Sequence, residues 1–199
     1  RQLNRFLTQM LSSANPSWYN ANAGQAGSIT VRQVLDGAGG LIATELADAP
    51  EVEAEMRRTL GRTYIGLGAF DQAAPHLRRA FELHATANDT YGVAFTTHLL
   101  SEVHQFKGEF DEAEPLARTA LAYFRTNGGD DGPELHMITA SDLATVIAGQ
   151  RPLDPEIVAL YRESIAVADE QHLNPAGTGV AVNNLGSTLI NVGRLDEAE

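Results

Sequence analysis

The sequence "GAFDQAAPHLRRAF", from Gly68 to Phe81, returns forty residues later as "GEFDEAEPLARTAL", from Gly108 to Leu121. Seven of the fourteen positions are identical at this one offset. A shorter copy, "GRLDEAE", begins at Gly193. Self-similarity at a fixed spacing predicts an array of repeated packing units, each stacked on its neighbour.

The apolar residues around these copies recur at helical spacing, and no stretch shows the alternation typical of a strand. We therefore expect an all-α fold of antiparallel helix pairs. The pairs are predicted at 51–67 with 71–86, 90–107 with 111–126, and 133–149 with 155–171, and a last helix at 178–192. Two further helices are predicted at 3–13 and 30–47, on either side of a loop at 20–28. The "DGAGG" stretch inside 30–47 predicts either close helix packing or a break in the helix.

These segments divide the chain into two parts. Residues 1–49 would form N-terminal helices and a Gly-rich loop, and residues 50–199 the repeats, at about 51–88, 89–130, 131–174 and a truncated 175–199. The third repeat is degenerate, because two prolines replace its Gly-x-Phe-Asp turn. Since the chain stops inside a copy of the motif, we expect it to be part of a longer protein.

The residues that recur have packing roles. Two helices that cross closely need small side chains at the contact and larger ones around it, and a helix that ends sharply favours glycine in the left-handed conformation. The small positions are Gly61, Gly186, Ala73, Ala80, Ala113 and Ala120, the large filling residue is Tyr64, and the helix-ending glycines are Gly68, Gly108 and Gly193.

This set of positions resembles the tetratricopeptide repeat. The stretch "LGRTY" (60–64) matches the first half of its pattern, and Ala73, Leu77 and Ala80 match the second half. The spacing of forty residues, with "NNLG" and "DEAEP", resembles the longer-helix variety found in kinesin light chains. The resemblance implies a right-handed α-solenoid that binds a protein or peptide segment along the first helices of its pairs.

The residues expected to line that groove come from several repeats. Arg58 and Arg62 would together hold a carboxylate, or they would instead pair with Glu55 or another local acid on a solvated face. Phe95 and Phe106 would form an aromatic floor, or close the core between repeats. The resemblance implies that Asn184 hydrogen-bonds a peptide backbone. The candidate set is Arg58, Arg62, Phe95, His98, Glu102, Phe106, Asn183 and Asn184, with Ser141, Asp142 and Thr145 from the third repeat.

The sequence offers little for chemistry beyond binding. His98 and Glu102 lie four residues apart on one helical face, but no third ligand is evident, so we expect no metal and no cofactor. The chain has no cysteine, which excludes disulfides and thiolate sites. No kinase motif or other catalytic motif is found, so this segment is not expected to be an enzyme. The net charge of −12 argues against a nucleic-acid partner.

The stretches "RFLTQMLSSANP", "ITVRQVLDGA" and 45–83 resemble the region that follows the kinase domain and membrane helix in certain bacterial serine/threonine kinases. That resemblance implies a non-catalytic sensor region outside the cytoplasm, attached to a membrane-anchored kinase. No apolar run in this sequence is long enough to cross a bilayer, so the segment itself is expected to make no membrane contact. The alternatives are a cytoplasmic adaptor without a kinase, or a homo-oligomer formed through 3–13 and 30–47.

Overall fold

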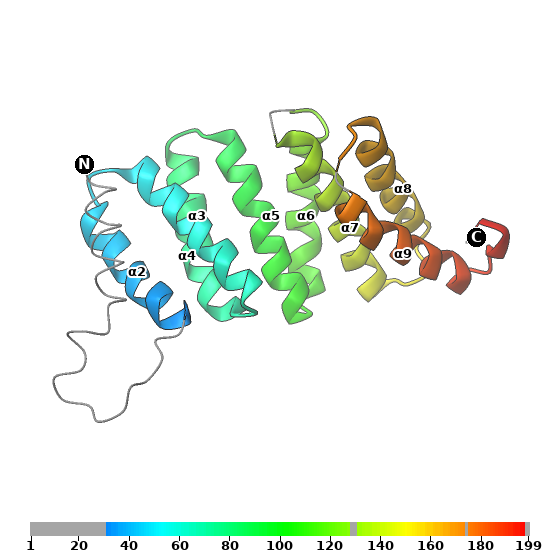
Figure 1. Ribbon diagram of the computed structural model, residues 1–199, viewed down its shortest axis with the longest axis horizontal. Coiled ribbons are helices and arrows are strands. Elements are labelled where there is room, and N and C mark those ends of the chain that lie inside the picture. The colour runs from blue at the N-terminus through cyan, green and yellow to red at the C-terminus, as the bar shows by residue number, and fades with distance from the viewer. Residues whose placement is uncertain (1–30, 128–130, 174, 198–199) are drawn as a thin grey trace, which may run out of the picture. The chain divides into compact units, whose positions relative to one another are not determined.

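The computed structural model describes residues 31–127, 131–173 and 175–197, which form helices and turns and contain no strand. These residues divide into two compact units, and the division falls between Asp89 and Thr90. Unit 1 holds α2 (Val31–Glu45), α3 (Pro50–Gly66) and α4 (Phe70–Thr86). Unit 2 holds α5 (Thr90–Lys107), α6 (Phe110–Phe124), α7 (Gly132–Gln150), α8 (Pro155–Glu170), α9 (Pro175–Asn191) and the 3₁₀ helix η2 (Leu195–Glu197). The predicted all-α class of helix pairs is confirmed (Figure 1).

The helices from α3 onward lie within a few residues of the predicted ranges, and α5 coincides with the predicted 90–107. The predicted helix at 3–13 and the loop at 20–28 lie outside the described residues, and the proposed division at residue 49 stays a prediction. The "DGAGG" stretch does not break its helix, since α2 continues through it. A Cβ on Gly39 would lie 2.9 Å from His76 Cε1, so close packing explains this glycine, whereas a Cβ on Gly37 or Gly40 would meet nothing within 4 Å.

Three helices end in the same way. Gly68, Gly108 and Gly193 have φ angles of +66°, +75° and +76°, in the left-handed region where glycine is favoured. In each case the N–H of the following residue donates to a carbonyl five residues back: Ala69 to Tyr64, Glu109 to His104, and Arg194 to Leu189. This bond satisfies a carbonyl that the helix leaves unpaired and fixes the turn into the next helix.

Within unit 1, α3 and α4 approach closely at Gly61. A Cβ on Gly61 would lie 2.5 Å from Cγ of the buried Leu77, so any larger residue would displace that side chain. Ala73 and Ala80 on α4 are fully buried. Tyr64 is also buried, and its hydroxyl donates to Asp36 Oδ1 on α2 at 2.6 Å. Burial and this carboxylate together raise the pKa of Tyr64, so the buried hydroxyl stays a hydrogen-bond donor.

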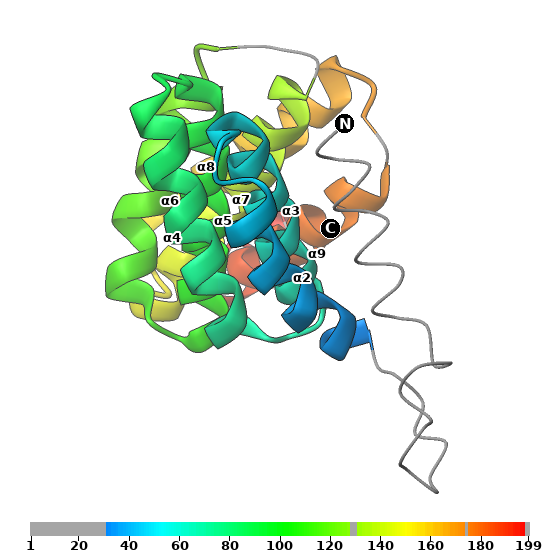
Figure 2. The ribbon, with the colours of Figure 1, turned by 90° about the vertical axis from the view of Figure 1, so that its left-hand side faces the viewer.

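Unit 2 is built in two layers. The first helices of successive pairs, α5, α7 and α9, lie side by side, while α6 and α8 pack against them as the second layer. Figure 2, which looks at the molecule from its side, shows α6 and α9 on opposite sides of α7. Ala113 and Ala120 on α6 are fully buried, and Gly186 on α9 is half-buried. The main core cluster contains Leu121, Leu143, Ile147, Ile157, Leu160 and Tyr161.

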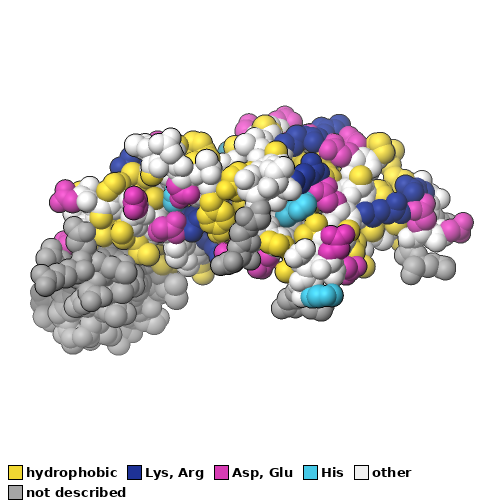
Figure 3. Space-filling model, turned by 90° about the horizontal axis from the view of Figure 1, so that it is seen from above, with side chains coloured by type: hydrophobic (Ala, Val, Ile, Leu, Met, Phe, Trp, Pro, Cys, Tyr) yellow, Lys and Arg dark blue, Asp and Glu magenta, His cyan; other side chains and the backbone are white. Residues whose placement is uncertain are grey.

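The exposed surface of the second layer carries ion pairs between repeats. Arg118 on α6 binds Glu156 on α8 at 2.7 Å, and Arg125 binds Glu163 at 2.6 Å, so both pairs span 38 residues of sequence. Arg118 also binds Glu114 of its own helix. Figure 3 shows how closely basic and acidic side chains alternate on one face. Exposed pairs of this kind contribute little stability one by one, and both connect the second helices of neighbouring pairs.

Candidate functional site

Three predicted groove residues lie on successive turns of α5. His98 is buried, Glu102 is half-buried and Phe106 is 57% exposed, so the helix runs from the core to the surface along this row. The neighbouring helix α7 brings Asp142 to the same place. His98 Nε2 lies 3.9 Å from Glu102 Oε2, and His98 Nδ1 lies 3.9 Å from Asp142 Oδ2. We call His98, Glu102 and Asp142 the α5–α7 cluster.

The α5–α7 cluster concentrates negative charge in a poorly solvated place. Burial, followed by the nearby Glu102 carboxylate, raises the pKa of Asp142 well above its usual range. Its Oδ2 is buried and accepts no hydrogen bond. Thr139 Oγ1 lies 3.2 Å from His98 Nδ1, the ring nitrogen that also faces Asp142. A cation that reached this cluster would favour the ionised form of Asp142, and both carboxylates would then attract it.

The predicted asparagines of α9 have different surroundings. Asn183 is exposed, whereas Asn184 is half-buried and its side chain hydrogen-bonds the Tyr161 hydroxyl of α8. Thr145 Oγ1 of α7 lies 3.0 Å from the same hydroxyl. Burial raises the pKa of Tyr161, so the hydroxyl stays protonated and links three helices. This network fixes the orientation of the Asn184 amide.

The remaining predicted residues are not gathered with these. Arg58 and Arg62 lie on α3 in unit 1; Arg58 Nη2 binds Glu55 Oε2 at 2.5 Å, and Arg62 is exposed. Phe95 is half-buried in unit 2 and packs against the core cluster that contains Phe124. Arg58 therefore has the ion pair, and Phe95 the core packing, that the alternatives to a groove role describe. A role of either residue in binding stays a prediction.

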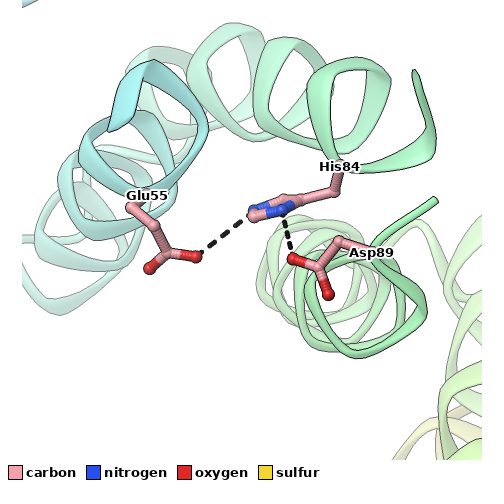
Figure 4. Close-up of side chains that lie close together, drawn as sticks. All are labelled: Glu55, His84 and Asp89. Atoms are coloured by element: carbon pink, nitrogen blue, oxygen red, sulfur yellow. Dashed lines mark ion pairs between the residues drawn. The ribbon is translucent and has the colours of Figure 1, made fainter. Parts of the chain in front are cut away.

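Unit 1 contains a second cluster with a histidine at its centre, which we call the α3–α4 cluster: Glu55, His84 and Asp89. Figure 4 shows the His84 ring between the two carboxylates, one from α3 and one from the residue before α5. His84 Nδ1 lies 2.8 Å from Asp89 Oδ2, and His84 Nε2 lies 3.7 Å from Glu55 Oε1. His84 is 3% exposed, while Glu55 and Asp89 are half-buried, so the cluster opens to solvent through its carboxylates.

The sequence pattern missed both three-residue clusters. Asp142 stands on a predicted groove helix, but it is 44 residues from His98, and no helical spacing connects them. The three members of the α3–α4 cluster likewise come from three separate segments. A usable signal existed in the repeat itself: at the offset of forty, Glu55 corresponds to Phe95 and His84 to Phe124, so polar residues stand where the next repeat is aromatic.

In the described part of the chain, no helix is both long and apolar enough to cross a membrane. Residues 52–126 match the family model described as tetratricopeptide repeat. No curated protein sequence matches the chain significantly.

Two solved structures show the fold. The crystal structure of BtubC (BKLC) from P. vanneervenii is 18% identical, with a TM-score of 0.69, over 96% of this chain and 75% of that one. A putative kinesin light chain from Podosopora anserina, with nearly identical TPR-like repeats, is 16% identical with a TM-score of 0.62, over 98% of this chain and 90% of that one. Tetratricopeptide repeats are protein-interaction units that present binding surfaces. Residues 52–126 therefore match the tetratricopeptide-repeat family, and the chain has the fold of kinesin-light-chain-like repeat proteins.

Proposed function

We propose that the layer formed by α5, α7 and α9 in unit 2 binds a protein segment that carries a basic side chain next to an apolar one. The observation that carries this proposal is the row on α5. An exposed phenylalanine, Phe106, follows one turn after the acidic α5–α7 cluster. Aromatic anchors beside a charged contact are typical of the residues that dominate protein interfaces.

The charge of the chain supports a basic partner. The net charge is −12, and the α5–α7 cluster holds two carboxyl groups that repel each other when both are charged; burial and the neighbouring Glu102 raise the pKa of Asp142 well above its usual range. An ammonium or guanidinium group between Glu102 and Asp142 would relieve that repulsion and supply hydrogen bonds to the buried Asp142 Oδ2. An acidic segment would meet charge of its own sign and be rejected.

The asparagines of α9 would position the backbone of the segment. Asn183 is exposed on the same layer, and the Asn184 amide is oriented by Tyr161. An amide has two donors and an acceptor, so one contact with Tyr161 leaves capacity for a peptide group. Arg58, Arg62 and Phe95 are also proposed contacts, but their ion pair, exposure and core packing make them weaker candidates.

Selection from a random peptide library, followed by affinity measurements on the selected peptides, tests this proposal. We expect the selected peptides to be enriched in Lys or Arg beside an aromatic or branched apolar residue. Phe106→Ala and Glu102→Gln should each weaken binding by about tenfold, which is the usual effect of removing an interface anchor. Higher salt should weaken the binding further, because the cluster is only partly buried.

Phe81→Ala is the matched control, because Phe81 is a partly exposed phenylalanine on α4, in the second helix of its pair. Its binding should equal that of the unmodified chain. Peptides that bind the Phe106 and Glu102 variants as tightly as the unmodified chain would refute the proposal. Enrichment of acidic peptides would contradict the predicted partner chemistry.

The attachment of this region to a bacterial membrane kinase is a further proposal, supported by the sequence resemblance alone. The coding sequence on both sides of the chain tests it: a Gly-rich loop, a catalytic Asp and an apolar helix upstream are expected. More repeats or a DNA-binding domain in their place would favour the cytoplasmic adaptor. Self-association through 3–13 and 30–47 is a separate proposal. If it is right, deletion of residues 1–28 should lower the mass of the particle in solution. An unchanged mass would exclude a role of 3–13 in self-association.

A further inference from the structure

Two residues of the α3–α4 cluster are polar, although the equivalent residues of the next repeat are both phenylalanines. Gly68 aligns with Gly108 at an offset of forty, and at the same offset Glu55 aligns with Phe95 and His84 with Phe124. Phe124 is 3% exposed, and Phe95 packs against its cluster together with Tyr91. Packing two helices of this repeat therefore does not require a histidine and a carboxylate at these positions. Their presence in the first repeat calls for another reason.

The geometry around His84 leaves one ring nitrogen without a role. Nδ1 lies 2.8 Å from Asp89 Oδ2, so Nδ1–H donates to this carboxylate. In the neutral ring Nε2 then carries a lone pair. Nε2 is buried, forms no hydrogen bond, and faces Glu55 Oε1 at 3.7 Å (Figure 4). Two electron-rich atoms that face each other across this distance repel unless a cation lies between them.

We propose that the α3–α4 cluster binds a divalent transition-metal ion of the zinc class, with His84 Nε2 and Glu55 Oε1 as ligands. Zinc bonds to imidazole nitrogen and carboxylate oxygen are about 2.1 Å long. Two such bonds to atoms 3.7 Å apart meet at an angle of about 125°, which a distorted tetrahedral site accepts. The ion therefore fits between these two atoms without a large movement of either side chain.

The neighbouring residues supply the second shell that such a site needs. Asp89 orients the His84 ring and selects the tautomer that binds metal through Nε2, as carboxylates do beside metal-bound histidines. Arg58 binds the other oxygen of Glu55, Oε2, at 2.5 Å, and so leaves Oε1 directed toward His84. Because Glu55 and Asp89 are half-buried, water or a side chain of a bound protein can complete the coordination.

A proton on Nε2 is the competing occupant of this position. It would form a charge-assisted hydrogen bond to Glu55, for which an N–O distance of about 2.7–2.9 Å is usual. The observed 3.7 Å is longer by almost 1 Å and fits two metal bonds better than one hydrogen bond.

Titration calorimetry with zinc chloride on the whole chain, at neutral pH, tests the proposal. We expect a single saturable site that Glu55→Gln and His84→Gln each remove. Asp89→Asn should keep the site but weaken it by about 10–100-fold, as loss of a second-shell partner does. Cobalt(II) is the spectroscopic probe: the unmodified chain should show the visible absorption of four-coordinate cobalt, and Glu55→Gln should abolish it. Glu55→Gln is the decisive variant because Glu55 is half-buried, and its fold is checked by circular dichroism.

Asp142→Asn is the matched control, because the α5–α7 cluster is the other histidine–carboxylate group of the described residues that could hold an ion. It should leave zinc affinity and cobalt absorption unchanged. Zinc binding that survives Glu55→Gln but is lost in Asp142→Asn would place the ion in unit 2 and overturn the proposal. No binding by the unmodified chain at millimolar zinc would overturn it as well.

Discussion

The first two repeats of this chain use one helix-pair framework but place different residues at several equivalent positions. In the first repeat, the buried Glu53 binds Arg57 at 2.6 Å and Arg79 at 3.3 Å, and His84 lies between two carboxylates. At an offset of forty, the second repeat has Val93, Thr97, Thr119 and Phe124 in the places of Glu53, Arg57, Arg79 and His84. At these four positions the first repeat has three charged residues and a histidine, whereas the second has two apolar residues and two threonines.

The difference shows which residues the framework itself requires. Both repeats keep the left-handed glycine at the turn and the fully buried alanines: Ala73 and Ala80 in the first, Ala113 and Ala120 in the second. Charged residues at the other positions are costly to bury, and apolar residues of similar volume often replace them without loss of stability. The ionic interior of the first repeat is therefore better explained by a binding role or by specificity than by packing.

Replacing the buried Phe124 of the second repeat by histidine, its counterpart in the first, should have the largest effect on stability. Phe124→His would put a ring with two polar nitrogens into an apolar cluster, where Phe124 is 3% exposed. We expect the free energy of unfolding to fall by about 3–4 kcal/mol, from lost apolar burial and an unsatisfied polar group. Urea denaturation followed by circular dichroism measures this. A change below about 1 kcal/mol would mean that the two interiors are interchangeable.

Neutralising Glu53, the buried carboxylate of the first repeat, should have the next largest effect on stability. Burial alone would raise the pKa of Glu53, but the hydrogen bonds and charges of Arg57 and Arg79 lower it below its usual range. A lowered pKa means that the charged form stabilises the fold above the pKa of the unfolded chain, and that this contribution is lost as the pH falls through the folded value. Glu53→Gln should therefore cost about 2–3 kcal/mol at neutral pH.

The cost of Glu53→Gln should shrink as the pH falls below the ordinary glutamate pKa of about 4.3, and it should vanish below the lower pKa of the folded Glu53. Urea denaturation of both proteins between pH 3 and 7 measures the difference. Glu82→Gln is the control, because Glu82 also binds Arg79 but is exposed, and its effect should be small at every pH. A Glu53→Gln cost that stays constant with pH would contradict the ionic explanation.

The repeat explains how much of the fold was predictable. Helix pairs, their ends and the close contact at Gly61 follow from small residues and glycines at fixed spacing, and these depend on local geometry that every copy shares. Helix propensity alone does not predict whether α2 continues through "DGAGG" or breaks there. Glycine weakens a helix by about 1 kcal/mol each, and only the contact of Gly39 with His76, 37 residues away, shows why glycine is tolerated there.

The clusters were less predictable for a related reason. Helical spacing placed His98 and Glu102 together, because they share one face of α5. It could not supply Asp142, which arrives from α7, or join Glu55, His84 and Asp89. Such groups form by packing between helices, so a single periodicity does not contain them. Comparing one repeat with the next, residue by residue, does locate the polar exceptions.

Giving the first repeat the aromatic pair of the second should have the smallest effect on stability. The double variant Glu55→Phe with His84→Phe removes a charged group and a buried ring whose Nε2 forms no hydrogen bond, and adds apolar area. We expect the free energy of unfolding to stay within about 1 kcal/mol of the unmodified chain, because apolar residues of similar volume often replace ionic groups without loss of stability and the half-buried Asp89 can rehydrate. The same denaturation experiment measures it. A large loss would show that the α3–α4 cluster is structural, whereas unchanged stability would leave ligand binding as the reason for its polar residues.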